Sequence, residues 1–439
     1  MKCRRCTCSS RENDIKLSSG EMDMKLGRCT CTSQEIVLDE EDLLTLILLR
    51  VPYRELLSFK SVSKKWLHLI TTPHFTSLLR DALPPLRASA LFIQRTYPNF
   101  LSKRLPDQVH FVPLDDPNAT SPFRNLDFAH DPYTSRQIRV CQSCNGLLLC
   151  SSARFFDFNL SNCYVYNPST NHLDTLSKQP LCYGYEGYYI GFAYDPSKSP
   201  HYKVIAYITK IPLSFVGDLH IYSSETGTWK ASAQSFLPPE GILFTDGVYW
   251  NGSMHWLSFL GADCSNLPDS LSDGLYFNVD EERFGTFPRP PIGAKSISVR
   301  SRYFGESEDH LHVTEVCQYA TSLTVYEMKS DYSGWFVKYL IDLDPIAKVF
   351  PEMTKHMSLS CDKTDYAVAV LSLVRRENFR EDSFLVLEIP GKAIRYNLVD
   401  GSFKLIWDFG VALNIKYNID LWTLGRFKVF PYLESVLRA

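Results

Sequence analysis

The feature that most restricts the fold of this 439-residue chain is a motif that recurs along most of its length. In each copy an aromatic residue ends a short β-branched or aromatic run, a polar turn follows, and a second run begins. The spacings between successive copies are 56, 55, 49 and 70 residues. Repeats of about 50 residues made of short strands are typical of four-stranded propeller blades. The five aromatic positions are Tyr166, Tyr222, Phe277, Tyr326 and Tyr396.

A second motif has the same period. Asn145-Gly146-Leu147 and Asn251-Gly252-Ser253 are 106 residues apart, which is twice 53. Residues 85–439 number 355, and dividing this length by 53 gives 6.7. The sequence therefore predicts an all-β propeller of six or seven blades over 85–439. We expect the N- and C-terminal strands to share one blade and so close the ring.

The segment 36–80 has a different texture and predicts a small helical module. Eighteen of the 35 residues in 36–70 are apolar. Asp39 is a good N-cap for a first helix, which ends near Arg50 because Pro52 disfavours helix in the residue before it. Two further helices are expected, one from Pro52 and one opened by Ser61 or Ser63 and closed by Thr71-Thr72-Pro73.

The first helix of this module is apolar almost all round, at positions 43, 44, 46, 47, 48 and 49. A surface helix carries one apolar stripe, so this helix is expected to be covered on more than one side. A module of this size also falls below the ~40 residues at which a domain usually folds unaided. We therefore expect an apolar partner surface. On pattern alone, that surface is either another protein or the rest of this chain.

Residues 38–66 resemble an F-box, a module that docks on the Skp adaptor of a cullin-based ubiquitin ligase. The quoted stretch is LDEEDLLTLILLRVP, continuing through LLSFKSVSKKW. One departure is that the family's opening Leu-Pro is Leu38-Asp39 here, although Asp39 keeps a helix start. The resemblance implies adaptor binding by Leu38, Leu43, Ile47, Val51, Pro52, Leu56, Leu57, Val62 and Trp66.

The long β-region is similar to the F-box-associated, kelch-related domain of plant F-box proteins, in which the propeller receives the substrate. Kelch repeats usually carry Gly-Gly pairs and this chain has none, so the likeness is to the plant-specific subtype with degenerate blades. The segments that carry the likeness are Ser143–Cys150, Tyr166–Thr170, Gly191–Pro196 and Trp250–Leu257.

Together the two resemblances imply a non-catalytic receptor subunit of a Skp–cullin–F-box ubiquitin ligase. The implied partners are the Skp adaptor and cullin, with an unidentified protein target on the propeller. Two alternatives stay open: an F-box scaffold that acts without ubiquitination, and a propeller lectin or hydrolase.

The sequence contains no recognised catalytic motif. There is no Gly-x-Ser-x-Gly elbow, no P-loop, no Gly-x-Gly-x-x-Gly and no sialidase-type Ser-x-Asp-x-Gly turn. His310-x-His312 places two imidazoles on one face of a strand, which can begin a metal site, but no third ligand is evident nearby. We therefore expect no metal and no cofactor.

Two segments are candidates for target binding. Tyr183, Tyr185, Tyr188 and Tyr189 crowd seven residues together with glycines, a mixture common in recognition loops. The alternative is that two of these tyrosines belong to a blade core. Arg375 and Arg376 begin a charged hairpin tip at 375–382, which is either a binding element or a solvated turn.

Composition narrows the partners and the compartment. The net charge of −3 and pI of 6.4 do not favour nucleic acid or an anionic membrane. No run approaches the ~20 apolar residues that span a bilayer, and the N-terminus does not resemble a signal peptide. Thirteen scattered cysteines do not suggest a secreted disulfide framework. We expect a soluble protein of the cytoplasm, the nucleus or both.

Residues 1–34 are polar, lack a period, and are predicted to be a disordered leader. Arg5-Cys6-Thr7-Cys8 recurs as Arg28-Cys29-Thr30-Cys31, which favours an unstructured duplication. The five cysteines could instead ligate zinc, although their spacing is not that of paired Cys-x2-Cys knuckles. Whether this leader belongs to the natural protein stays open, because Met22 or Met24 would also serve as a start.

Overall fold

The structure is a computed structural model that divides into two compact units, residues 1–52 and 53–439. The predicted leader 1–34 and the predicted linker at 81–85 lie outside the described residues, so these boundaries stay predictions. The structure describes residues 41–51, 56, 59–72, 74–75, 78–79, 87–95, 109–116, 119, 121–122, 139–151, 163–177, 187–209, 217–232, 242, 244, 247–258, 274–291, 299–356, 364–376, 382–409 and 427–433.

Two of the three predicted N-terminal helices are described. Helix α2 (Glu41–Leu48) lies in the first unit and begins with acidic residues, which favour the positive end of a helix dipole. Helix α4 (Lys64–Thr71) lies in the second unit. The Ser63 side chain caps α4 by accepting a hydrogen bond of 3.1 Å from the backbone N–H of Trp66. Most of the predicted second helix lies outside the described residues.

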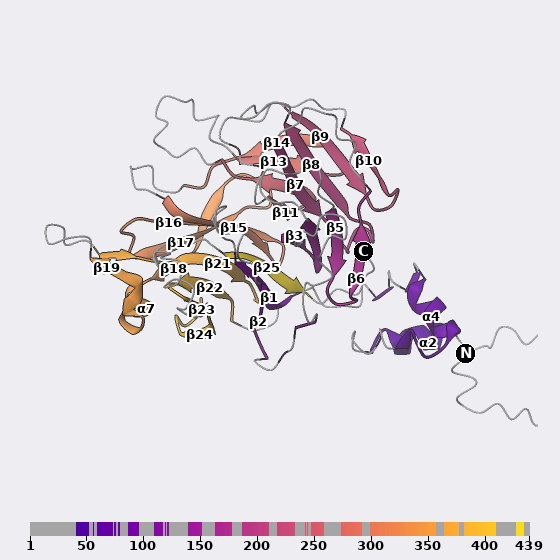
Figure 1. Ribbon diagram of the computed structural model, residues 1–439, viewed down its shortest axis with the longest axis horizontal. Coiled ribbons are helices and arrows are strands. Elements are labelled where there is room, and N and C mark those ends of the chain that lie inside the picture. Colours follow the sequence, from indigo (N-terminus) through magenta and orange to yellow (C-terminus); the bar gives the residue numbers. More distant parts are fainter. Residues whose placement is uncertain are drawn as a thin grey trace, which may run out of the picture. The chain divides into compact units, whose positions relative to one another are not determined.

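Antiparallel strands account for most of the remaining described residues, and they form six sheets that are the blades of a propeller (Figure 1). Five blades have four described strands and the sixth has three. From the inner to the outer strand, they are blade 1, β3 (Arg139–Cys144), β4 (Leu147–Ser151), β5 (Cys163–Asn167) and β6 (His172–Thr175); blade 2, β7 (Gly187–Ala193), β8 (Lys203–Thr209), β9 (Gly217–Ser223) and β10 (Thr228–Ala231); blade 3, β11 (Val248–Trp250), β12 (Ser253–Trp256), β13 (Gly274–Asn278) and β14 (Arg283–Phe287); blade 4, β15 (Val299–Ser307), β16 (His310–Cys317), β17 (Ser322–Met328) and β18 (Trp335–Asp342); blade 5, β21 (Ala369–Val374), β22 (Phe384–Ile389), β23 (Lys392–Asn397) and β24 (Phe403–Asp408); and blade 6, β25 (Phe427–Leu433), β1 (Ala88–Arg95) and β2 (Val109–Pro113).

The inner strands close into a ring. Each contacts the inner strand of the next blade, in the order β3, β7, β11, β15, β21, β25 and back to β3. In blade 6 the C-terminal strand β25 pairs with the N-terminal strand β1 from Arg95↔Phe427 to Ala88↔Leu433, seen in Figure 1 as yellow beside indigo. The described strands thus confirm the expected closure by both ends of the chain, with six blades.

The repeats found in the sequence mark equivalent places in the blades. All five aromatic residues lie in the third strand of a blade. Asn145-Gly146 and Asn251-Gly252 connect the first two strands of blades 1 and 3, and all four residues have positive φ angles. Two successive positive φ angles define the tight hairpin turn that Asn-Gly favours.

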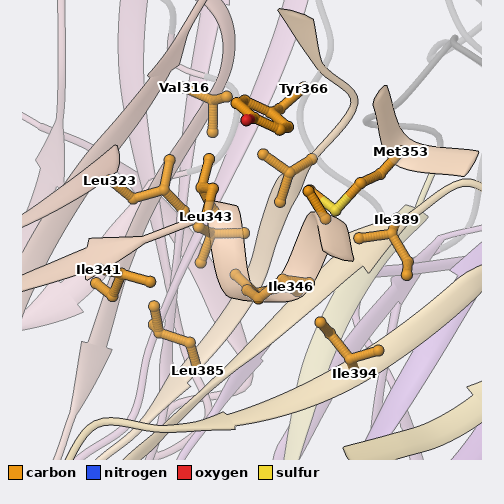
Figure 2. Packing of buried hydrophobic residues seen from close by; sticks show 14 of the residues in the cluster. Val316, Leu323, Ile341, Leu343, Ile346, Met353, Tyr366, Leu385, Ile389 and Ile394 are labelled. Atoms are coloured by element: carbon orange, nitrogen blue, oxygen red, sulfur yellow. The ribbon is translucent and has the colours of Figure 1, made fainter. Parts of the chain in front are cut away.

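The spacing of 70 residues between Tyr326 and Tyr396 comes from an insertion between blades 4 and 5. It contains helix α7 (Asp344–Val349), the short 3-10 helix η4 (Pro351–Met353), and the paired strands β19 (Thr354–His356) and β20 (Thr364–Tyr366). Figure 2 shows Ile346 and Met353 of this insertion among apolar side chains of both blades. The neighbours labelled there include Val316, Leu323 and Ile341 of blade 4, and Leu385, Ile389 and Ile394 of blade 5.

In the described parts of the chain, no helix is long and apolar enough to cross a membrane.

The closing blade generates the first prediction. Phe92 of β1 is fully buried, and its ring centroid lies 5.6 Å from that of Phe111 and 5.4 Å from that of Tyr432. Phe92→Ala leaves a cavity between the N- and C-terminal strands, so we expect the free energy of unfolding to fall by about 3–5 kcal/mol. Chemical denaturation measures this change. The control Val399→Ala removes a side chain that is 73% exposed and should change stability by less than about 0.5 kcal/mol. Equal effects of the two substitutions would contradict the closure.

Candidate functional site

Helix α2 has two apolar faces with different exposure. Leu44 and Leu48, one turn apart, are 2% and 0% exposed. Leu43, Leu46 and Ile47 are 41%, 57% and 46% exposed. These three side chains form an open apolar patch within a single turn of helix, since residues three and four apart are neighbours on a helix surface. Such a concentration of exposed leucine and isoleucine is typical of a surface that is covered by another molecule.

The segment around α4 also exposes apolar side chains. Val62 and Leu67 are 59% and 44% exposed. Trp66 is half-buried, and its ring meets that of Phe59 edge-to-face at 5.3 Å between centroids. This contact fixes the orientation of the indole while leaving part of it accessible.

The predicted adaptor-binding residues divide into three groups. Leu43, Ile47 and Val62 are exposed, and Val51 and Trp66 are half-buried. Leu56 is 1% exposed, so it supports the packing of its own unit and offers no contact surface. Two exposed residues, Leu46 and Leu67, were missed, although Leu46 lies three positions after Leu43 and helical spacing pointed to it. Leu38, Pro52 and Leu57 lie outside the described residues.

The tyrosine-rich candidate segment is only partly described. Tyr188 and Tyr189 lie in β7, the inner strand of blade 2, where their backbones pair with Ile208 and Tyr207. Their side chains, and all of Tyr183 and Tyr185, lie outside the described part. A role of these four residues in target binding therefore stays a prediction.

The prediction that Arg375 and Arg376 begin an exposed hairpin tip is wrong. Their side chains are 5% and 3% exposed, and each forms an ion pair with a neighbouring blade. Arg375 donates to Glu327 of blade 4 at 2.9 Å. Arg376 donates through two nitrogens to Asp115, which follows β2 of blade 6, at 2.6 and 2.7 Å. These arginines connect three blades, and this placement argues against a role in target binding.

Glu327 is the centre of a buried charged cluster. Besides Arg375, it faces His310 at 2.8 Å, His312 at 3.4 Å and Lys338 at 3.7 Å. Burial would raise the pKa of this carboxyl group, but contact with His312 and the charge of Arg375 outweigh burial and hold the pKa at about 2. Burial lowers the pKa of His312, so its imidazole is stabilised in the neutral form. Glu327 is therefore ionised and paired with Arg375.

This cluster supplies the third group that the His310-x-His312 motif lacked in the sequence. Arg375 and Lys338 already provide the carboxylate with positive charge, which a metal ion would otherwise supply. Across the ranges that the structure describes, no three His, Cys, Asp or Glu side chains are grouped as metal ligands.

The described thiols of blade 1 do not resemble nucleophiles. Burial raises the pKa of Cys141 to about 11, and it raises the pKa of Cys144 and Cys150 further. A thiol acts as a nucleophile in its thiolate form, so such environments make cysteines inert. Their surroundings are those of structural residues in the propeller core.

Comparison with known proteins assigns both parts of the chain to families. Residues 41–78 match the F-box domain, and residues 113–400 match the F-box associated beta propeller domain. The chain is 33% identical over 433 residues to F-box protein At5g07610 of Arabidopsis thaliana, covering 93% of this chain and 94% of that one. F-box protein At3g08750 of the same plant is 30% identical over 220 residues, or 49% of this chain and 53% of the relative. F-box/kelch-repeat protein At3g17530, also of Arabidopsis, is 23% identical over 269 residues, or 57% of this chain and 60% of the relative.

The Glu327 cluster generates a stability prediction. Glu327→Gln leaves the Arg375 guanidinium buried without its counter-charge, so we expect a loss of about 3 kcal/mol in the free energy of unfolding at pH 7. The folded pKa of about 2 lies below the ordinary value of 4.5. The unfolded chain therefore takes up this proton first, and the contribution of Glu327 is lost as the pH falls from about 4.5 toward 2.

Denaturant titrations of both proteins at several pH values measure this effect, and the difference between them should shrink over that acid range. Asp331→Asn, in an exposed turn of the same blade, is the control and should change stability little. A difference that stays constant down to pH 2 would contradict the assignment.

Proposed function

Because this chain belongs to the family of F-box proteins with an F-box-associated β-propeller domain, we propose that it is the target receptor of a Skp–cullin–F-box ubiquitin ligase. The observation that carries the proposal is the open apolar patch of Leu43, Leu46 and Ile47 on α2, within the residues that match the F-box domain. A patch of this kind suits an apolar adaptor surface.

The docking would bury side chains that the isolated chain leaves in water. Removing apolar surface from water contributes roughly 25 cal/mol per Å², so three large aliphatic side chains contribute several kcal/mol. Val62, Leu67 and the accessible part of Trp66 would extend the contact surface. A charge placed in the centre of the α2 patch would oppose binding, because it would lose its hydration without gaining a partner.

The propeller would hold the protein target. The rigid ring of blades is suited to recognition, since loops on a rigid scaffold bind without a large ordering cost. The ligase would then act by positioning: a partner enzyme carries the ubiquitin thioester, and the receptor raises the local concentration of the target's lysines. No side chain of this chain takes part in the bond-forming step of such a mechanism. We place this activity in the cytoplasm, the nucleus or both.

Capture by a purified Skp adaptor tests the proposal. We expect the wild-type chain to bind and Ile47→Asp to lose at least about tenfold in affinity, which corresponds to 1.4 kcal/mol. Leu405→Asp is the matched control, because Leu405 lies on the propeller strand β24 and is 46% exposed, as Ile47 is. Binding can be measured by co-purification and by titration calorimetry.

Circular dichroism shows whether each variant is folded. If the folded wild-type chain fails to bind the adaptor, the proposed function is wrong. If Ile47→Asp and Leu405→Asp bind equally well, the α2 patch is not the docking surface.

A further inference from the structure

The outer strands of the blades differ in how they protect their free edges. An unpaired strand edge can add a strand from another chain, and proteins usually guard such edges with short or charged strands. In blades 1, 2 and 3 the outer strands β6, β10 and β14 have four, four and five residues. None of the three carries a strongly exposed large apolar side chain.

The outer strand of blade 4 does not follow this pattern. β18 has eight residues and ends its sheet, so no described strand pairs with its outer side. Phe336, Val337 and Leu340 are 38%, 58% and 72% exposed. No other outer strand in the described blades carries three such side chains. A long apolar edge of this kind favours association.

The residues of β18 identify a second copy of the chain as a suitable occupant. In an antiparallel pair centred on Leu340, the two Leu340 side chains meet on the two-fold axis. Lys338 of each copy then lies opposite Asp342 of the other, and oppositely charged residues in such positions stabilise paired strands. The Asp342 side chain is exposed, and the Lys338 side chain is 24% exposed.

Other centres fit less well. A pair centred on Lys338 would place two ammonium groups directly opposite each other, which is destabilising. The centre at Leu340 thus joins the most exposed apolar residue of the strand to its own copy and satisfies both flanking charges. An interface in which the same patch serves both copies is the common form of protein dimers.

We propose that the chain self-associates through β18, with two copies pairing their outer strands antiparallel about Leu340. The two four-stranded sheets of blade 4 then become one continuous sheet across the dimer. A single strand pair buries less surface than a stable interface of about 1,600 Å², so the dimer is weak and depends on concentration. The inference does not depend on adaptor docking, because β18 lies in the propeller.

Sedimentation velocity of the full chain tests the proposal between about 1 and about 100 µM, where a weak dimer of this kind dissociates. We expect the wild-type chain to move from monomer to dimer over this range. Leu340→Lys and Leu340→Glu each place like charges on the two-fold axis, so each variant alone should dimerise at least about tenfold more weakly. An equimolar mixture of the two should dimerise again, because a lysine then faces a glutamate.

Leu405→Lys is the control, since it places the same charge on the outer strand of blade 5 and should leave the dimer intact. The variants change a side chain that is 72% exposed, so they are expected to fold. A wild-type chain that stays monomeric at about 100 µM would overturn the proposal and leave β18 to a different partner. A Leu340→Lys dimer as strong as wild type, or a mixture that stays monomeric, would also overturn it.

Discussion

The pairing of β1 with β25 is the constraint on which the rest of the propeller depends. It joins residues more than 330 positions apart and turns a row of blades into a closed ring. Blade 6 is also tied to both neighbours. Gln94 of β1 accepts a hydrogen bond of 3.0 Å from the backbone of Val140 in blade 1, and Asp115 after β2 pairs with Arg376 beside blade 5. Backbone pairing and two polar ties thus hold the closing blade.

Buried charges continue these ties around the ring. Arg375 reaches Glu327 in blade 4, and within that blade Arg302 pairs with Glu315 while donating to the carbonyl oxygen of Ser258 in blade 3. Breaking one partner of such a pair leaves an uncompensated charge, so these contacts strongly favour one arrangement of the blades. The result is a rigid body suited to presenting a recognition surface, while the exposed apolar patch of α2 serves a different partner.

Local patterns predicted the architecture because they repeat within each blade. The aromatic position of Tyr166 and its equivalents, and the Asn-Gly turns, depend on neighbours close in sequence, so their period is visible in one chain. The insertion at 343–368 was hidden because it interrupts this period. Arg375 and Arg376 looked like a solvated tip because their partners lie 48 and 261 residues away. The adaptor-binding prediction named Ile47 correctly as exposed, but it could not separate Leu46 from the buried Leu44 and Leu48, because apolar residues surround that helix.

The central claim is that one chain couples adaptor docking through α2 to target binding through the propeller. The most direct measurement compares ubiquitinated proteins by mass spectrometry in plant cells that express the wild-type chain, Ile47→Asp or neither. The account predicts a set of proteins whose ubiquitination rises with the wild-type chain and not with Ile47→Asp, while both forms still bind the same proteins through the propeller. Equal ubiquitination with both forms, or no change with either, would contradict it.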